Sequence, residues 1–424
     1  MEVKPGYKQT EVGVIPEEWE VKRLGDCLSA RPDYGINAPA VAYSDRLPVY
    51  IRITDITEDG RFSPEKLASV QYSESDDFYL SDGDIVFART GASVGKSYRY
   101  DRRDGQLVFA GFLIRVRPDP RKLLPAFASA YLATGTYWRW VRLMSMRSGQ
   151  PGINGNEYSQ LPFPLPPLSE QRAIAEALGD VDVLIGGLDR LIAKKRDLKR
   201  AAMQQLLTGQ TRLPGFSGEW EKVNFADIAD KTVKWSIAGG PFGSNLKASD
   251  YCPEGVRILQ LQNIGDGRFC DDYAIYTSEE KADELLSNNI YPGEIILSKM
   301  GDPVARACFV PVADRRYLMA SDGIRLAIDP QRFDKRFVHD LINSPYFRRK
   351  AIEASTGSTR QRIGLFELKS LPFLAPPLAE QTAIAAVLSD MDAEIEALER
   401  RLAKTRALKL GMMQELLTGR TRLV

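Results

Sequence analysis

Two long stretches of the chain carry apolar side chains at alternating steps of three and four residues. Such steps are typical of the heptad seam of a coiled coil. Each stretch predicts a helix of about 39 residues, or about 58 Å at a rise of about 1.5 Å per residue. The seam positions of the first stretch, residues 169–207, are Ile174, Leu178, Val181, Ile185, Leu188, Ile192, Lys195, Lys199, Ala202 and Leu206, and those of the second are Ile384, Leu388, Met391, Ile395, Leu398, Leu402, Thr405, Lys409, Met412 and Leu416.

Both stretches carry signals of helix ends. Acidic residues lie early, among them Glu170 and Glu380, and basic residues lie late, as the helix dipole favours. Gly209 and Gly419 follow the stretches, and glycine is the usual residue of a left-handed helix cap. Because a lone amphipathic helix needs a partner, we expect the two helices to pack on each other, antiparallel since globular units connect them. The alternative is that each helix packs on its own domain.

The chain contains an internal repeat. "LPPLSEQRAIAEALGDVD" from Leu165 returns as "APPLAEQTAIAAVLSDMD" from Ala375, an offset of 210, and 28 of the 48 positions in residues 166–213 are identical to their partners. Weaker echoes pair "SDGDIVFARTGASVGKS" with "YPGEIILSKMGDPVARA" and "EEWEVKRLGD" with "GEWEKVNFAD". A repeat of this length predicts two similar structural units.

We therefore predict an α+β protein with a pseudo-two-fold internal repeat. Two similar mixed α/β domains are expected, separated by two long antiparallel coiled-coil helices. The predicted segments are a first domain (1–165), a central helix (166–213), a second domain (214–375) and a C-terminal helix (376–424).

Composition narrows the classes of function. The chain of 424 residues is 44% hydrophobic and 27% charged, as in a globular protein, and it has neither a long apolar run nor a signal peptide pattern. We expect a cytoplasmic protein with no membrane partner. The four cysteines show no metal-ligand spacing and are expected to be buried thiols, without a metal site. The single histidine, His339, disfavours most triad and metal schemes and is expected at the surface or as a helix cap.

The stretch "RTGASVGKS" at residues 89–97 resembles a phosphate-binding loop. Only three residues separate Gly91 from Gly95, whereas the phosphate loop needs four, and no amphipathic helix follows. In the second copy Gly95, Lys96 and Ser97 become alanine, arginine and alanine. Both copies keep a strand, a glycine turn and two basic residues. This pattern indicates that the loop positions positive charge and does not bind a nucleotide.

The net charge of +1 gives poor support for a nucleic-acid partner, but the local distribution of basic residues gives better support. No acidic residue lies between Asp119 and Glu157, where arginines alternate with Tyr137, Trp138 and Trp140. Arginine and lysine contact phosphates, whereas arginine to guanine and glutamine or asparagine to adenine are the usual readers of base edges. The candidate DNA-binding residues are Arg52, Thr54, Arg89, Lys96, Arg99, Arg142, Arg147, Gln150, Asn154, Gln260, Gln262, Asn263, Lys299, Arg306, Arg360, Gln361 and Arg362. The alternative is that these polar loops are merely solvated.

The motifs "EVGVIPEEWEVKRLGD", "GDIVFARTG"/"GEIILSKMG" and above all the twice-written "PPLSEQRAIA…LLTGQTRL" and "PPLAEQTAIA…LLTGRTRL" resemble the DNA-specificity subunit of type I restriction-modification enzymes over essentially the whole chain. The resemblance implies two target-recognition domains, each reading half of a split asymmetric site in double-stranded DNA. It also implies that the helices dock two adenine-methylating modification subunits, and that restriction subunits carrying a motor and nuclease join them. The helix residues proposed for this seam and docking role are Ile174, Leu178, Ile185, Leu188, Ile384, Leu388, Ile395 and Leu398.

By the same resemblance the chain is not itself an enzyme and binds no cofactor. S-adenosylmethionine, ATP and magnesium are expected in the partner subunits. Three alternatives remain open at this point: a subunit of a methylation-only or related phage-defence system, a nucleotide-hydrolysing enzyme, and a coiled-coil scaffold without a DNA role.

Overall fold

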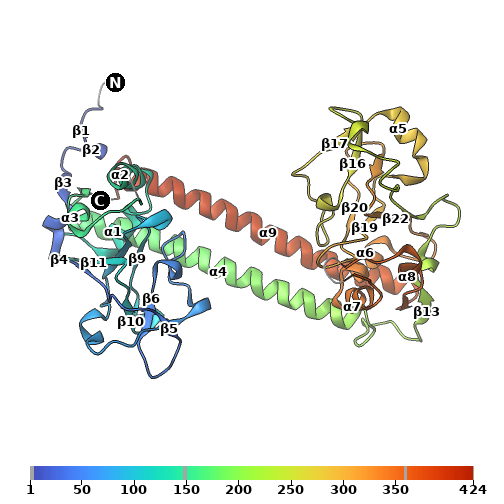
Figure 1. Cartoon of the computed structure of the whole chain (residues 1–424), viewed down its shortest axis with the longest axis horizontal. Coiled ribbons are helices and arrows are strands. Elements are labelled where there is room, and N and C mark those ends of the chain that lie inside the picture. Colours follow the sequence, from blue (N-terminus) through green and yellow to red (C-terminus); the bar gives the residue numbers. More distant parts are fainter. Residues whose placement is uncertain (1–3, 147–149, 358–360, 424) are drawn as a thin grey trace. The chain divides into compact units, whose positions relative to one another are not determined.

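The computed structural model describes residues 4–146, 150–357 and 361–423. The chain divides into two compact units, one made of Met1–Asp189 with Arg401–Val424 and the other of Arg190–Arg400. Each unit contains one globular domain and a part of both long helices (Figure 1). The units therefore do not follow the predicted segments, because the helices pack on the domains as well as on each other.

Over its described residues, the first unit contains two four-stranded sheets and two two-stranded sheets. One sheet has the order β4-β11-β8-β9 and the other β10-β6-β7-β5, while β1 pairs with β2 and β3 with β12. The strands are β1 (Tyr7–Thr10), β2 (Gly13–Pro16), β3 (Glu20–Arg23), β4 (Leu28–Tyr34), β5 (Val41–Ala42), β6 (Val49–Ile51), β7 (Ala68–Ser69), β8 (Ile85–Ala88), β9 (Ser97–Arg99), β10 (Leu107–Phe109), β11 (Leu113–Pro118) and β12 (Pro162–Leu165). The helices are α1 (Pro125–Tyr131), α2 (Gly135–Ser145), α3 (Gly155–Ser159) and the first part of α4 (Leu168–Leu206).

The second unit repeats this plan. Its sheets have the orders β14-β22-β19-β20 and β15-β17-β16-β21-β18, and β13 pairs with β23. The strands are β13 (Glu221–Asn224), β14 (Ile237–Gly239), β15 (Tyr251–Cys252), β16 (Val256–Leu259), β17 (Ile275–Thr277), β18 (Asn289–Ile290), β19 (Ile295–Ser298), β20 (Ala307–Phe309), β21 (Tyr317–Met319), β22 (Gly323–Leu326) and β23 (Pro372–Ala375). The helices are α5 (Glu279–Glu284), α6 (Lys335–Asn343), α7 (Pro345–Glu353), α8 (Leu365–Lys369) and the first part of α9 (Leu378–Leu416).

The offset of 210 residues extends well upstream of the conspicuous repeat. Strand β19 corresponds to β8, β20 to β9, β21 to β10, β23 to β12 and helix α8 to α3, each at this offset. The predicted duplication of a mixed α/β domain is confirmed. The fully apolar strand β8 is buried at every position, as a strand inside a core requires.

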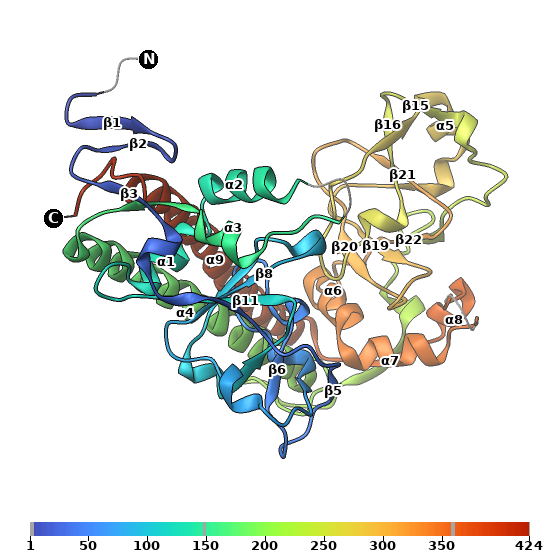
Figure 2. The same ribbon diagram turned by 60° about the vertical axis from the view of Figure 1, so that its left-hand side comes forward.

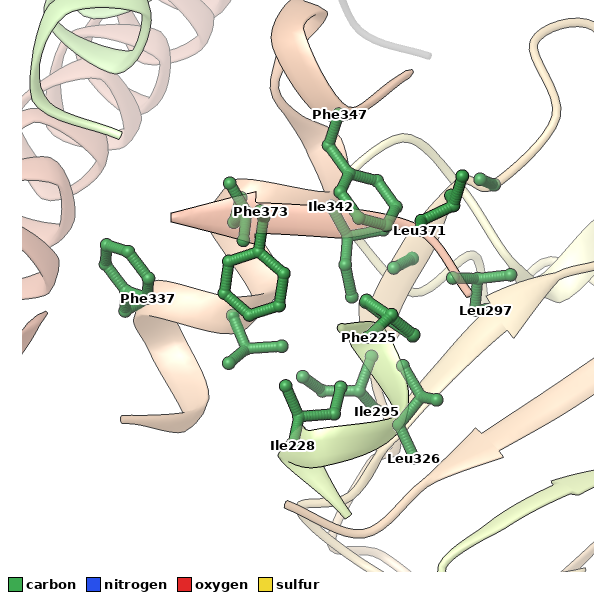
Figure 3. Packing of buried hydrophobic residues seen from close by; sticks show 14 of the residues in the cluster. Phe225, Ile228, Ile295, Leu297, Leu326, Phe337, Ile342, Phe347, Leu371 and Phe373 are labelled. Atoms are coloured by element: carbon green, nitrogen blue, oxygen red, sulfur yellow. The ribbon is translucent and has the colours of Figure 1, made fainter. Parts of the chain in front are cut away.

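Each domain has its own apolar core. In the second unit the core joins strands β19 and β22 to helices α6 and α7 and to β23, and Phe225, Phe337, Phe347 and Phe373 are at most 1% exposed (Figure 3). The same cluster includes Ile384 and Leu388 of α9. The cluster of the first unit includes Ile174 and Leu178 of α4 together with residues of the last turns of α9. The helices are thus anchored in the domain cores.

Ion pairs show the direction of the two helices. In the second unit Lys199 Nζ lies 2.6 Å from Asp392 Oδ1 and Arg196 Nη2 lies 2.5 Å from Glu399 Oε1, so partner numbers fall on α9 as they rise on α4. In the first unit the pairs Lys409 with Asp182 (2.7 Å) and Arg406 with Asp189 (3.0 Å) repeat this pattern. The predicted antiparallel pairing is confirmed within each unit (Figure 2). The alternative, in which each helix packs only on its own domain, is excluded.

The seam residues lie where the heptad pattern predicted. Seven of the eight proposed residues are buried, with exposed fractions from 0% for Leu388 to 8% for Ile395, and Leu398 is half-buried. Since these side chains face the interior, a partner docked on the helices would contact other residues. Gly209 and Gly419 end the helices with φ values of 71° and 68°, as the left-handed cap requires.

The repeated "PPLxEQ" motif at the start of each long helix contacts the repeated "TRL" motif that follows the other long helix. We call this contact the clasp, and it forms once in each unit. In the first unit Glu170, at the start of α4, accepts hydrogen bonds from Trp19 Nε1 (2.9 Å) and from Arg422, which follows α9. In the second unit Glu380 accepts from Trp220 Nε1 (3.2 Å) and from both Arg212 Nε (2.5 Å) and Nη2 (2.6 Å). The clasp therefore joins the beginning of one long helix to the segment that follows the other.

The glutamine next to each clasp glutamate is equally occupied. Gln171 is fully buried; its Oε1 accepts from the Leu124 amide (2.9 Å) and its Nε2 donates to the Lys122 and Pro166 carbonyls (2.9 Å each). Gln381 makes the corresponding bonds to the loop before α6. The repeated "PPLxEQ" is thus explained by buried polar groups that need partners.

His339 is buried, which corrects the expectation of a surface or capping residue. It is 4% exposed, its ring stacks on Phe309 at 4.7 Å between centroids, and its Nδ1 lies 2.8 Å from Asp340 Oδ1. Burial alone would raise the pKa of Asp340, but the His339 hydrogen bond and the Arg336 guanidinium outweigh it and hold that pKa below its ordinary value. Helix α6 is buried on more sides than its sequence suggested, and this explains the error.

All four cysteines are free, but only Cys27 and Cys308 are buried. Burial raises the pKa of the Cys308 thiol to about 12. The expectation that Cys252 and Cys270 are buried was wrong, since both are half-exposed. Within the described ranges no cluster of three or more His, Cys, Asp or Glu side chains has the geometry to hold a metal ion. None of the helices in those ranges is both long enough and apolar enough to cross a membrane.

Candidate nucleic-acid interface

A turn after strand β8 and a loop before helix α3 meet in the first domain. The Arg89 amide donates to the Phe112 carbonyl (3.1 Å), the Ile153 amide to the Arg89 carbonyl (2.9 Å) and the Gly91 amide to the Pro151 carbonyl (3.0 Å). We call residues 89–91, 111–112 and 150–155 the first loop cluster. These bonds bring together three of the predicted residues: Arg89, Gln150 and Asn154.

The second domain forms the same cluster bond for bond. The Lys299 amide donates to the Asp322 carbonyl (2.7 Å), the Ile363 amide to the Lys299 carbonyl (3.0 Å) and the Gly301 amide to the Gln361 carbonyl (3.4 Å). Residues 299–301, 321–322 and 361–364 are the second loop cluster, which brings together the predicted Lys299, Gln361 and Arg362. The scaffold is the same in both domains, while the side chains on it differ at most positions.

Aromatic rings and an arginine dominate the first loop cluster. The Arg89 guanidinium lies over the Tyr34 ring at 5.0 Å and near the Phe112 ring at 6.0 Å. Phe112 is 58% exposed and Tyr34 41%. The sequence analysis did not select either ring. Phe112 belongs to an apolar run, which is typical of a buried strand. Exposed aromatics beside an arginine are suited to stacking on bases or sugars.

Gln150 and Asn154 differ in how free their side chains are to contact a base. Gln150 is exposed. Asn154 is exposed too, but its Oδ1 accepts from the Glu157 amide (2.9 Å) and so caps helix α3. The predicted base contact of Asn154 would therefore have to use its amide nitrogen.

An ion pair marks the second loop cluster. Arg362 Nη2 lies 2.6 Å from Asp322 Oδ1, with 46% and 23% of the two side chains exposed. Asp322 was not predicted; it occupies the position of Phe112 in the first domain, and nothing in its local sequence distinguishes it. Gln361 is exposed, and Lys299 is half-buried. The cluster presents an amide, a guanidinium and a carboxylate, which match the groups on base edges.

A short 3₁₀ helix after the central strand of the second sheet lies near each cluster. In the second domain Gln260 and Gln262 line a cavity of about 240 Å³ together with Asp322, and Gln262 Nε2 lies 3.3 Å from Gln260 Oε1. In the first domain the corresponding Arg52 is held by Asp55 through two bonds of 2.8 and 2.7 Å, and Thr54 donates to the same carboxylate. The Arg52 guanidinium is thus less free to contact DNA than predicted.

Asn263 is a structural residue, which corrects its prediction as a base reader. It is 1% exposed; its Oδ1 accepts from the Gln260 amide (3.0 Å) and its Nδ2 donates to the Cys270 and Tyr273 carbonyls (3.0 and 2.9 Å). Every polar group of this side chain is used inside the loop. A residue that satisfies buried backbone carbonyls cannot also reach a base edge.

The loop that resembled a phosphate site is filled by the protein itself. The Gly95 amide donates to the Ala88 carbonyl (3.0 Å), and Tyr137 Oη donates to the Gly95 carbonyl (2.6 Å). Lys96 Nζ pairs with Glu58 Oε1 at 2.5 Å, and its side chain is only 17% exposed. The Gly95 amide is therefore committed to the hairpin, and the Gly95 carbonyl accepts from helix α2.

Of the remaining predicted residues, the structure describes Arg99, Arg142 and Arg306, and none of the three is among the residues that form the loop clusters. Arg99 is at the opposite end of the β8–β9 hairpin, where it lines a cavity of about 630 Å³ with Asp84 and Arg172. Burial raises the pKa of Asp84. Arg142 is exposed on α2, and Arg306 packs at the Gly301 turn, 3.3 Å from where a Cβ on that glycine would lie. Arg147 and Arg360 lie outside the described residues.

Two similar domains, each with a loop cluster at its surface and a long helix at its end, define the class of protein. The family model for the type I restriction modification DNA specificity domain matches residues 16–193 and again residues 218–405. The chain belongs to this family.

Similar proteins agree with this assignment over nearly the whole chain. The putative type I restriction enzyme MjaX specificity subunit of Methanocaldococcus jannaschii is 26% identical, with 98% of this chain and 96% of that protein covered. The EcoKI specificity subunit of Escherichia coli K12 is 21% identical, with 96% and 89% covered. A solved type I restriction-modification structure has a TM-score of 0.59 at 17% identity, covering 96% of this chain and 99% of that one. The S subunit from M. genitalium has a TM-score of 0.56 at 13% identity, covering 98% of both chains.

Proposed function

We propose that the chain is the DNA sequence-recognition subunit of a type I restriction-modification complex, in which each domain reads one half of a bipartite, asymmetric site in double-stranded DNA. The pair of loop clusters carries this proposal. Both have the same backbone bonding, yet one presents Arg89 with two exposed rings and the other presents Gln361, Arg362 and Asp322. A constant scaffold with different side chains suits two readers of two different sequences.

The long helices dock two adenine-methyltransferase subunits in this proposal, and they fix the distance between the half-sites. Leu198 of the second unit and Leu408 of the first are 47% and 58% exposed and are related by the offset of 210. Two equivalent exposed leucines suit two copies of one partner. Because the seam residues are buried, the docking contacts would involve such outward positions.

Catalysis belongs to the partners in this proposal. The methyltransferase subunits bind S-adenosylmethionine, and the restriction subunits, which act as translocase and nuclease, bind ATP and Mg²⁺. The assembly works in the cytoplasm, where its DNA substrate is. The Val94, Gly95 and Lys96 amides donate to carbonyls of the same hairpin, which supports recognition rather than nucleotide hydrolysis as the role of that loop.

Methylome sequencing tests recognition directly. Cells that express this chain with its modification subunits are expected to methylate adenines in a motif of two short half-sites separated by unspecified bases. Exchanging residues 215–375 with those of a relative of different specificity is expected to replace one half-site only, because each loop cluster is built entirely within one domain. The unexchanged chain is the control. A contiguous motif, or a change in both half-sites, would contradict separate reading by the domains.

Lengthening the helices tests their role as a spacer. Seven residues inserted after Asp189 and seven after Arg400 keep the heptad pattern and lengthen each helix by about 10.5 Å. We expect the gap between half-sites to grow by about three base pairs at about 3.4 Å each, with both half-sites unchanged. Four-residue insertions at the same points break the seam and serve as the comparison. An unaltered gap after the heptad insertion would exclude the spacer role.

A further inference from the structure

A glycine-rich loop in the second domain presents one bare aromatic ring. Phe242 is 83% exposed, between Pro241, which is buried, and Gly243. Its carbonyl accepts a hydrogen bond from the Asn245 amide (2.8 Å), which closes a turn, and Leu246, 9% exposed, anchors the far side. The ring is thus held outward by a turn that is fixed at both ends.

The root of this loop is locked against the second loop cluster. A Cβ on Gly240 would lie 1.8 Å from the Ala320 carbonyl oxygen, so that only glycine fits there. The Gly240 amide donates to the Gly323 carbonyl (2.8 Å). Through these contacts the loop has a defined position beside residues 321–322 of the second loop cluster.

The ring borders groups that can read bases. Phe242 lines the cavity of about 240 Å³ whose wall also includes Tyr251, Gln260, Gln262 and Asp322. Tyr251 is 38% exposed. A ring next to two amides and a carboxylate has stacking and hydrogen-bonding groups at one place, as a nucleobase requires.

The first domain lacks this ring. Gly35 corresponds to Gly240, since its amide donates to the Leu113 carbonyl (3.4 Å) and its Cβ would also meet carbonyl oxygens. Two residues later stands Asn37, in the place of Phe242. The exposed Phe112 of the first domain lies beside the Arg89 guanidinium, whereas within the described part of the chain Phe242 has neither a ring nor a cation partner. The two domains therefore differ in the aromatic group they direct outward.

We propose that Phe242 is a wedge that inserts into the base stack of the half-site read by the second domain. Apolar side chains that enter a duplex unstack one base step and bend the DNA, and the cost depends on which step is deformed. The second half-site would then be selected partly by the ease of unstacking, in addition to base-edge contacts, and the first would not. This inference rests on the proposed function, because it presumes that the second loop cluster faces DNA.

The test uses the complex of the chain with its modification subunits and duplexes that carry its methylation motif. The adenine analogue 2-aminopurine, whose fluorescence rises when it is unstacked, replaces bases of the second half-site one at a time, except the methylated adenine, which the modification subunit itself takes out of the stack. The wild-type complex is expected to raise fluorescence at one step. Phe242→Ala and Phe242→Asn, the residue of the first domain, are expected to abolish this rise and to weaken binding about tenfold, as loss of a stacked ring does.

Val312→Ala is the matched control. Val312 is also 83% exposed, but it lies beyond Val310, at the end of the β19–β20 hairpin opposite the loop cluster. This variant is expected to keep both the fluorescence rise and the affinity. A mismatch at the unstacked step should restore binding of Phe242→Ala, because the unstacking cost is then already met.

The outcomes separate this inference from the function on which it rests. If the wild-type complex binds its motif with no rise at any position, or if Phe242→Ala keeps full affinity and the full rise, the wedge is refuted and recognition by the second domain stands. If the complex does not bind the motif at all, the proposed function fails as well. Circular dichroism of Phe242→Ala should match the wild type, since the ring contributes nothing to the core.

Discussion

Replacing Arg362 with alanine is expected to relax recognition at one base pair of the second half-site and to weaken binding by about 1–3 kcal/mol. The Arg362 side chain is 46% exposed, and the carboxylate of Asp322 holds its Nη2 at 2.6 Å. A guanidinium held in this way presents its remaining donors outward in a fixed fork, which is the geometry that reads the O6 and N7 atoms of guanine. Methylome sequencing of the variant should show a degenerate position where the wild-type motif has a fixed base.

Arg400→Ala is the matched control for this substitution. Arg400 carries the same charge and is 71% exposed on α9, in an i to i+4 pair with Glu396. It is expected to leave the motif unchanged. If Arg362→Ala also leaves every position of the motif fixed, Arg362 does not read a base, whereas a uniform loss of affinity without degeneracy would assign it to a phosphate.

Glu170→Ala is expected to lower the free energy of unfolding by about 3–5 kcal/mol. Glu170 is fully buried in the clasp of the first unit, where it accepts from Trp19 Nε1 at 2.9 Å and from Arg422. Without it the buried indole N–H has no partner, which costs about 1–3 kcal/mol, and a charged hydrogen bond worth about 1.5–3 kcal/mol is lost. Urea unfolding followed by tryptophan fluorescence measures this effect.

The control for the clasp is an exposed ion pair on the same helix. Asp197→Ala removes the partner of Arg200, and with 70% and 69% of these side chains exposed the expected change is about 0.5 kcal/mol or less. Glu170→Gln keeps an acceptor for the indole, and its loss of free energy of unfolding is expected to lie between those of Glu170→Ala and Asp197→Ala. Equal effects of Glu170→Ala and Asp197→Ala would show that the clasp adds nothing to stability.

The loop clusters show where sequence reasoning reached its limit. Gln150, Gln361 and Arg362 could be selected because arginines and amides in glycine-rich loops are the known readers of bases. Arg89 and Lys299 could be selected because both repeats keep a basic residue before a glycine turn. Their assembly depends on backbone bonds between segments about sixty residues apart, and no local pattern predicts such bonds. For the same reason the exposed rings of Tyr34, Phe112 and Phe242 escaped notice, since exposure depends on the neighbours that a side chain meets after folding.

The sequence by itself determined the two long helices, their seam, their glycine ends and the duplication of the domain. These features follow from periodicity and local conformational preference, which act between residues a few positions apart. Only the tertiary structure decided that Glu170 serves Trp19 and Arg422, that Lys96 is occupied by Glu58, and that Asn263 and His339 are buried. Those outcomes depend on which polar groups packing removes from water, and a buried polar group takes the partner that the fold places beside it.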